Sequence, residues 1–247
     1  MCSSDLRVGD IAEGFFAEQR IDAEPRTGKR GGAFCASVAQ DARPFMLMNY
    51  TDRMDDVMTL AHELGHGMHF TLAAEKQTAL SFHTGLALAE VPSTFAEIIA
   101  FDHLMATEDD EATRTALVCE RVEGSFATVF RQTVLARYEQ DAYRMRAEGT
   151  TLTDDRLSEI WIARNSAYYG DAVDLPEGYG LGWSYIPHFI STRFYTYAYV
   201  FAHLVTLALY ARYREDGDDF VPRYLDFLAA GGSAEPAEVL RPLEIGR

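Results

Sequence analysis

The sequence has few cysteines: only three occur in 247 residues. Cys2, Cys35 and Cys119 are an odd number, and no two of them have the CxxC spacing of a metal-binding or redox pair. The sequence therefore indicates neither a disulfide framework nor a zinc site made of cysteines. Unpaired thiols suit a reducing compartment, so we predict a cytoplasmic location.

Long apolar runs are also missing. No stretch reaches the roughly 18 residues that a membrane span needs, and the N-terminus lacks the basic-then-apolar pattern of a signal peptide. The longest candidate, from Tyr195 to Tyr210, is interrupted by His203 and is rich in tyrosine, which is typical of a core helix. We therefore expect no membrane partner.

Basic residues are scarce, with 22 Lys and Arg against 38 Asp and Glu, and the formal charge is -16. Such an excess repels phosphate backbones and anionic lipid surfaces, which argues against nucleic-acid partners. Its simplest meaning is solubility. Hydrophobic residues at 48% and charged residues at 24% are ordinary values for a globular chain, so we expect the chain to fold.

Internal repeats and low-complexity segments are absent, and the length fits one compact domain over residues 1–247. The start, "MCSSDLRVGD", carries no helix cap or apolar period that would open a domain. This start predicts a truncated coding sequence and leaves open whether the residues before Arg7 belong to the natural protein. A partner domain on the N-terminal side would then be missing.

Helix signals dominate the rest of the sequence, so we expect a mainly α fold. "AFCAS" and "PFMLMNY" are short apolar runs separated by a polar turn, and they predict a β-hairpin over residues 33–37 and 44–50. The predicted helices cover residues 11–19, 55–71, 88–105, 109–147 (one helix or two abutting ones), 153–170 and 190–214, with two short helices flanking "AAGGSAEP".

The stretch "HELGHGMHF", residues 62–70, carries three histidines and a glutamate on the helix predicted over residues 55–71. Residues four apart lie on one helix face about 6 Å apart, so His62 and His66 can direct both imidazoles at a single ion. Zinc accepts such nitrogens at about 2.0 Å. Glu63 can reach a water on the metal, which is the arrangement of HExxH metallopeptidases. The pattern predicts one Zn²⁺ per chain.

A catalytic zinc site needs a third protein ligand and keeps one position open. His69 lies two turns, or roughly 10 Å, from His62 along the helix axis, which is too far for both to hold one ion. The metzincin extension fails because the positions of its glycine and histidine hold His69 and Leu72. A thermolysin-like glutamate would fall at Leu86, so the nearest carboxylate on the next helix is Glu90.

Glu97 follows Glu90 by two helical turns and shares its helix face. A carboxylate there can accept the N–H of a zinc-bound histidine, which fixes the tautomer of that histidine and raises its basicity. Two acids in an apolar helix are costly unless a positive charge lies opposite, and a metal ion would explain both. We expect His69 in the core or beside a ligand, and His83 and His103 on the surface or in packing contacts.

A bare HExxH match also occurs by chance on surface helices, so a structural helical protein without metal is an alternative. Against this alternative, Ala61, Leu64 and Met68 turn the helix toward a core. The two glutamates at workable spacing favour the metal site, and a zinc content near zero would favour the structural alternative.

Three segments, "IDAEPRTGKRGGAFCAS", "FMLMNYTDRMDDVMTLAHELGHGMH" and "LAEVPSTFAE", together resemble oligoendopeptidase F, of the thimet-oligopeptidase-like zinc metallopeptidases. "WSYIPHFISTRFYTYAY" continues the match, which runs from about Gly14 to the C-terminus. The resemblance implies a mainly α, zincin-like catalytic domain with a small hairpin or sheet beside the HExxH helix. Family members are longer chains in which the substrate lies in a channel between two halves, so this sequence resembles the C-terminal catalytic half alone.

The resemblance implies a zinc endopeptidase that hydrolyses short unfolded peptides. It transfers the zinc ligands to His62, His66 and Glu90, and the general base and acid to Glu63. In the family, a histidine and tyrosines from the C-terminal helical segment stabilise the oxyanion.

This role falls here to His188 with Tyr195, Tyr197 or Tyr199. The spacing from His188 to these tyrosines is about one residue longer than the family pattern, which leaves the choice among them open. We favour Tyr197.

The strand around Phe45 to Asn49 is predicted to pair with the extended substrate backbone. Such main-chain pairing binds peptides with little dependence on their sequence. An alternative function is a catalytically weak zinc- or peptide-binding fragment, because half of the substrate channel would be absent. The sequence determines neither the peptide preference nor the oligomeric state.

Overall fold

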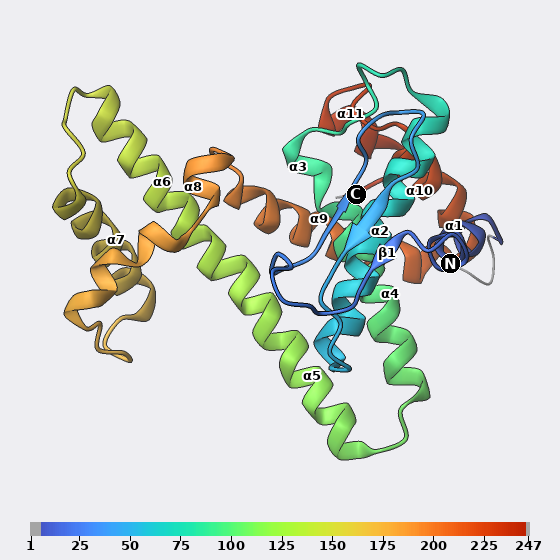
Figure 1. The fold of residues 1–247 in the computed structure, drawn as a ribbon, viewed down its shortest axis with the longest axis horizontal. Coiled ribbons are helices and arrows are strands. Elements are labelled where there is room, and N and C mark those ends of the chain that lie inside the picture. The colour runs from blue at the N-terminus through green and yellow to red at the C-terminus, as the bar shows by residue number, and fades with distance from the viewer. Residues whose placement is uncertain (1–5, 246–247) are drawn as a thin grey trace. The chain divides into compact units, whose positions relative to one another are not determined.

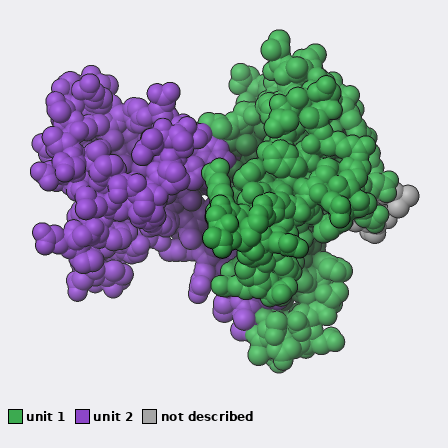
Figure 2. All heavy atoms as spheres, in the orientation of Figure 1, with its two compact units in different colours: residues 1–114, 202–247 green, residues 115–201 purple. Residues whose placement is uncertain are grey.

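The computed structural model describes residues 6–245, and the chain divides into two compact units. Unit 1 combines the residues up to Arg114 with those from Ala202 onward, and unit 2 covers the residues between them (Figure 2). The expected single domain over residues 1–247 stays a prediction. Cys2 and the expectation about the start of the chain lie outside the described residues.

Helices make up 68% of the described residues, which confirms the predicted mainly α fold. None of the helices in residues 6–245 is long and apolar enough to cross a membrane. Unit 1 contains α1 (Leu6–Ala17), β1 (Ile21–Asp22), β2 (Phe34–Ala36), β3 (Phe45–Leu47), α2 (Met54–Lys76), α3 (Leu86–Ala89), α4 (Val91–Thr107), α10 (Phe220–Ala229) and α11 (Pro236–Leu240) (Figure 1). Unit 2 contains α6 (Gln132–Ala147), α7 (Asp154–Tyr169) and α8 (His188–Ser191), while α5 (Glu111–Phe126) and α9 (Thr196–Asp216) run across the boundary between the units.

A three-stranded sheet packs against α2, with the strand order β1-β3-β2. β2 and β3 are antiparallel, with Phe34 opposite Leu47, and this confirms the predicted hairpin. β1 pairs in parallel with β3 and was not predicted, because two residues in a turn-rich segment carry no recognisable period. Met46 and Met48 of the hairpin segment are buried with Phe15 of α1 against one side of α2.

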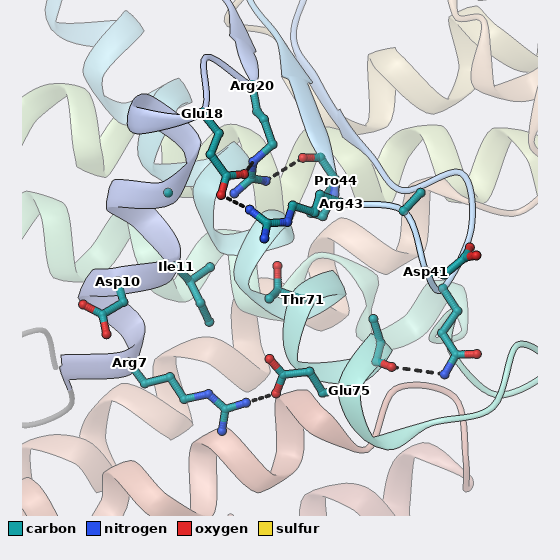
Figure 3. Close-up of a pocket in the computed structure, with 14 residues that line it drawn as sticks. Arg7, Asp10, Ile11, Glu18, Arg20, Asp41, Arg43, Pro44, Thr71 and Glu75 are labelled. Carbon is teal, nitrogen blue, oxygen red and sulfur yellow. Dashed lines mark hydrogen bonds and ion pairs between the residues drawn. The ribbon is translucent and has the colours of Figure 1, made fainter.

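Ion pairs join α1 to the elements beside it, as Figure 3 shows. Arg7 pairs with Glu75 of α2, and Arg43 pairs with Glu18 at the end of α1. Arg20 donates a hydrogen bond to the Pro44 carbonyl oxygen at 2.6 Å, just before β3 begins. These contacts link α1 and the segment before β3 to α2, and their residues line an open pocket of about 400 Å³.

The backbones of α2 and α4 approach one another closely at Gly65. A Cβ atom at this position would lie 2.5 Å from the Pro92 carbonyl oxygen and 2.6 Å from the Ser93 Cα. Gly67, one half-turn further along α2, is pressed against Phe15 in the same way, because a Cβ there would lie 2.4 Å from the ring. Gly65 therefore lets the backbones of α2 and α4 pack closely, and Gly67 leaves room for the Phe15 ring on the other side of α2.

Two of the predicted helices differ from the structure, one by a break and one by a later first residue. The helix predicted over residues 88–105 is broken at Glu90, because Pro92 in the first turn of α4 lacks an N–H and cannot continue the preceding helix α3. The helix predicted from residue 190 begins only at Thr196, after Phe194 has adopted a φ of 58°. That conformation is left-handed and interrupts a right-handed helix.

Residues 111–147 form a continuous helical stretch, most of it in unit 2, where one helix or two abutting helices were predicted over residues 109–147. A single π-helical turn, Ala127–Arg131, joins α5 to α6. Thr153 caps α7 as expected, because its hydroxyl oxygen accepts the Arg156 N–H at 3.3 Å. The core of the unit forms where α6 and α7 meet, around Tyr138 and Trp161.

We predict that Gly65→Ala lowers the free energy of unfolding by about 1–3 kcal/mol, because its new methyl group forces α2 and α4 apart. Thermal unfolding followed by circular dichroism measures the effect. Gly124→Ala is the matched control: that glycine lies in α5 with nothing within 4 Å of its added Cβ. The control should raise stability by about 0.5–1 kcal/mol, since alanine favours a helix over glycine. An equal gain in both variants would contradict the close approach at Gly65.

Candidate metal centre

His62, His66 and Glu90 converge on one point in unit 1. The Glu90 Oε2 atom lies 3.3 Å from His62 Nε2 and 3.5 Å from His66 Nε2, and the three candidate ligand atoms all lie within 4.8 Å of one another. Zinc bonds of about 2.0 Å in a tetrahedral arrangement place neighbouring ligand atoms about 3.3 Å apart. The donor set and its spacing therefore fit a divalent cation with one position left for water or substrate.

Local structure explains how each ligand reaches this point. His62 and His66 lie one helical turn apart on α2, and their ring centroids are 4.9 Å apart. Glu90 stands at the break between α3 and α4 and is only 5% exposed. Gly65 lies between the two histidines and leaves room for the backbone at Pro92. Because α2 and α4 approach closely there, the Glu90 carboxylate lies beside the imidazoles.

The charges in the cluster support one another. Burial opposes the charged form of Glu90, yet hydrogen bonds to His62 and His66 outweigh it and hold the Glu90 pKa well below its ordinary range. Burial likewise lowers the pKa of His62, but hydrogen bonds to Glu90 and Glu97 outweigh it and raise that pKa to about 10. The two carboxylates thus favour a positive charge on His62. A divalent cation would take the place of the proton that His62 carries in the metal-free cluster.

Two further side chains orient the ligands. The Glu97 Oε1 atom lies 2.5 Å from His62 Nδ1, which leaves the Nε2 atom of the same ring facing Glu90. The Ser93 hydroxyl lies 2.9 Å from the Glu90 carbonyl oxygen and 3.2 Å from the Glu90 Oε2 atom, and it can donate to either. Sequence reasoning placed Glu97 beside a ligand histidine but missed Ser93. Ser93 could have been found from its position three residues after Glu90. A hydroxyl at that position can form a hydrogen bond with the residue that precedes the helix.

Glu63 is a buried acid beside the two histidines of α2. The residue is 5% exposed, and its Oε2 atom has no hydrogen-bond partner among the described residues. Burial raises the pKa of Glu63, whereas the neighbouring imidazoles and the Cys35 backbone N–H favour its charged form. A buried carboxylate oxygen without a partner is costly, so an exchangeable group such as water is expected to satisfy it.

Three other histidines of unit 1, His69, His83 and His103, do not belong to the cluster. His69 is 4% exposed, and burial lowers the pKa of its imidazole to about 3, so it is neutral near pH 7. His83 is exposed and contacts the rings of Phe70 and Phe82, and His103 is exposed. These placements agree with the core and surface positions expected from the sequence.

Unit 2 carries a second group of predicted site residues. The His188 ring stacks on Tyr195 with centroids 5.4 Å apart, and the Tyr199 hydroxyl lies 3.4 Å from His188 Nε2. Tyr197 is 44% exposed and falls between these two tyrosines in sequence, which places it on another face of the helix that begins at Thr196. The structure thus brings Tyr195 and Tyr199 to His188, while the favoured role of Tyr197 stays a prediction.

The sequence of the whole described chain matches a known family. Residues 4–245 match peptidase family M3. The chain belongs to this family. The resemblance to oligoendopeptidase F is confirmed by curated relatives. Oligopeptidase PepF of Bacillus subtilis (strain 168) is 34% identical over 221 residues, which cover 90% of this chain and 33% of the relative. The chromosomal oligoendopeptidase F of Lactococcus lactis subsp. cremoris is 35% identical over 226 residues, which cover 91% of this chain and 37% of the relative.

The M3 chain therefore spans about a third of the length of these curated relatives. A solved structure of Pz peptidase A with an inhibitor shares the fold, with a TM-score of 0.84 over 99% of this chain and 44% of that one, at 19% identity. The comparisons establish a peptidase family and fold.

We predict that the M3 chain purifies with, or takes up, one zinc ion, and that Glu90→Ala abolishes this uptake. Removing Glu90 leaves two imidazoles, which hold a metal far more weakly than three ligands do. Elemental analysis after dialysis against buffered zinc measures the stoichiometry. His103→Ala, which removes an exposed histidine of α4, should leave it unchanged. Full zinc content in Glu90→Ala would remove Glu90 from the ligand set.

Glu97→Gln should weaken zinc binding by roughly 10–100-fold without abolishing it, because Glu97 orients the His62 ring but does not face the ion. Competition with a chromogenic chelator gives the affinity. Glu108→Gln, at the far end of α4, is the control and should bind zinc as the unaltered chain does. Equal affinities in Glu97→Gln and the control would mean that the contact to His62 has no part in metal binding.

Proposed function

We propose that this M3 chain is the catalytic portion of a zinc-dependent endopeptidase that hydrolyses short unfolded oligopeptides in the cytoplasm. The observation that carries the proposal is the buried Glu63 carboxylate, with one oxygen lacking a hydrogen-bond partner among the described residues, beside the convergent His62, His66 and Glu90. That combination supplies a metal-ligand set and a base at one place. The names of the relatives, which are oligopeptidases, support the same activity.

The residues of the cluster divide the chemistry among themselves. His62, His66 and Glu90 would hold the ion, which when bound acts as a Lewis acid and lowers the pKa of a water toward neutrality. Glu63 accepts the proton of the attacking water and later delivers it to the leaving amine. Its raised pKa suits both roles, because a proton transfers most readily in both directions when the pKa of the carrier lies nearer the operating pH.

The substrate backbone requires a strand with a free edge. The strand predicted for this role, β3, lies in the middle of the sheet and is paired with β1 on one side and β2 on the other, so that prediction was wrong. β2 is an edge strand, and the backbone N–H of its Cys35 is oriented toward Glu63. We therefore assign the pairing of an extended peptide to the open edge of β2.

In unit 2, His188 with one of its tyrosines is proposed to stabilise the negative oxygen of the tetrahedral intermediate. Imidazole and phenol groups can both donate a hydrogen bond to an oxyanion. The contacts to His188 favour Tyr195 and Tyr199 for this role beside the expected Tyr197.

A second candidate function is a fragment that binds zinc or peptide and catalyses poorly. The observation that favours it is the length of the chain, about a third of that of its curated relatives. A fluorogenic oligopeptide assay with measured zinc content separates the two functions. Zinc binding without hydrolysis would favour the fragment.

We expect Glu63→Gln to keep its zinc and to lose nearly all hydrolysis, because glutamine preserves the shape of the side chain but cannot accept the proton of water. Peptide cleavage measured beside zinc content tests this. Glu75→Gln changes an acid on the same helix outside the cluster and should retain activity. Full activity of Glu63→Gln, or activity that persists in the unaltered chain after a chelator has removed the zinc, would overturn the mechanism.

A further inference from the structure

Glu139 is a buried acid that the proposed reaction does not use. It lies on α6 and is only 2% exposed. Burial raises the pKa of its carboxyl group. A carboxyl group at such a position is costly unless it makes a specific hydrogen bond. Its Oε1 atom accepts the backbone N–H of Phe194 at 2.7 Å, across 55 residues of sequence.

The backbone at Phe194 forms a turn that is also closed by a long local hydrogen bond, from the Tyr195 N–H to the Thr192 carbonyl oxygen at 3.3 Å. Phe194 has a φ of 58°, and this left-handed conformation is unfavourable for a residue that carries a Cβ atom. The turn separates α8, which begins with His188, from α9, which begins at Thr196. It therefore sets the direction in which the chain returns from His188 to Tyr195.

The return of the chain at Phe194 is what allows the rings of the second cluster to meet. His188 and Tyr195 stack with an interplanar angle of 12°, and Tyr199 approaches the same imidazole edge-on at 5.9 Å between centroids. If residues 188–199 formed one unbroken helix, Tyr195 and Tyr199 would follow His188 at about two and three turns, roughly 10 and 16 Å along the axis. The bend at Phe194 replaces those separations with direct contact.

Side chains of α6 support both ends of this bend. Tyr138 contacts Phe189, the neighbour of His188, with ring centroids 4.9 Å apart. Tyr143 contacts Phe194 itself at 4.7 Å. A cavity of about 510 Å³ lies beside Glu139 and Phe189, so packing fills this side only in part. The hydrogen bond from Phe194 to Glu139 is the directional contact between α6 and the bend.

We propose that Glu139 is a positioning residue for the reaction: by accepting the Phe194 N–H it fixes the left-handed turn that holds Tyr195 and Tyr199 against His188. Glu139 touches neither substrate nor metal and acts only through this segment. The inference deepens the proposed function and rests on it for its kinetic consequence. Its structural part, the dependence of the His188 cluster on Glu139, stands on the contacts of unit 2 alone.

The kinetic test compares two substitutions of similar size. Glu139→Met removes the acceptor, and Glu139→Gln keeps a carbonyl oxygen for the Phe194 N–H but removes the charge. We expect Glu139→Met to lower kcat on the order of 10-fold or more with little change in KM, since groups that act on the oxyanion contribute in the transition state. Glu139→Gln should restore kcat to within about 2-fold, because a carboxamide oxygen accepts the same bond. Both variants should keep their zinc.

Asp141→Asn is the matched control, because Asp141 is a nearly buried acid on the same helix that pairs with Arg144 and Arg164 instead of the bend. It should lower thermal stability without altering kcat. A double variant gives the sharper comparison: in a His188→Ala background, Glu139→Met should cause no further loss of kcat, because its effect runs through that residue. Independent, multiplicative losses would overturn the proposal.

Proton NMR of the imidazole signals tests the geometry without any activity. Stacking on Tyr195 should shift the His188 signals upfield in the unaltered chain, with His188→Ala providing the assignment. Glu139→Met should move them toward random-coil positions, and Glu139→Gln and Asp141→Asn should not. Unmoved signals in Glu139→Met would overturn the positioning role. An unaltered chain that binds zinc but cleaves no peptide would contradict the proposed function while the NMR result still decides the role of Glu139.

If Glu139→Met does not fold, hydrogen exchange in the unaltered chain still decides the matter. The Phe194 amide lies outside both flanking helices, so protection from exchange must come from its bond to Glu139. A protected Phe194 amide supports the proposal, and one that exchanges as fast as an open loop overturns it.

Discussion

The contact of α2 with α4 at Gly65 is the constraint on which the metal centre depends. A methyl group on Gly65 would lie within 3 Å of the Pro92 carbonyl group and the Ser93 Cα, so only glycine allows the two backbones to come so close. Pro92 ends α3 and leaves Glu90 at the break, where its carboxylate faces His62 and His66. One glycine and one proline thus place three ligand atoms from two separate segments around one point.

Hydrogen bonding distinguishes the acids of this centre. Glu90 is tied by two imidazoles and by Ser93, and Glu97 is tied to His62. Glu63 retains one buried oxygen without a partner among the described residues. The imidazoles that contact Glu90 lower its pKa, which suits a ligand, whereas a carboxylate with a raised pKa and an oxygen that no described residue contacts suits proton transfer. The assignment of Glu63 as the base follows from this difference in surroundings.

Different interactions stabilise the two clusters of candidate residues. The cluster in unit 1 gathers charged groups whose mutual attraction offsets the cost of burying them. The cluster in unit 2 gathers aromatic rings and depends on a backbone turn at Phe194 that is unfavourable by itself. In the first cluster an ion can satisfy the charge, while in the second a neighbouring helix must hold the strained backbone through Glu139.

Local patterns in the sequence were enough to determine the helical class, the β2–β3 hairpin, and the positions of His62, Glu63 and His66 on one helix, because side-chain period and helical spacing act over a few residues. Spacing along the next helix also brought Glu90 and Glu97 into consideration, and both lie against His62, while the ligand role of Glu90 stays a prediction.

Tertiary structure alone decided the features that rest on contacts between distant segments. The strand β1 exists because β3 lies beside it, and the central place of β3 removes it as a partner for substrate. At Phe194, where the chain turns back, Glu139 of another helix accepts the backbone N–H, and this bend brings Tyr195 against His188. Periodicity cannot reveal such features, since the free energy that stabilises each of them comes from residues far away in the sequence.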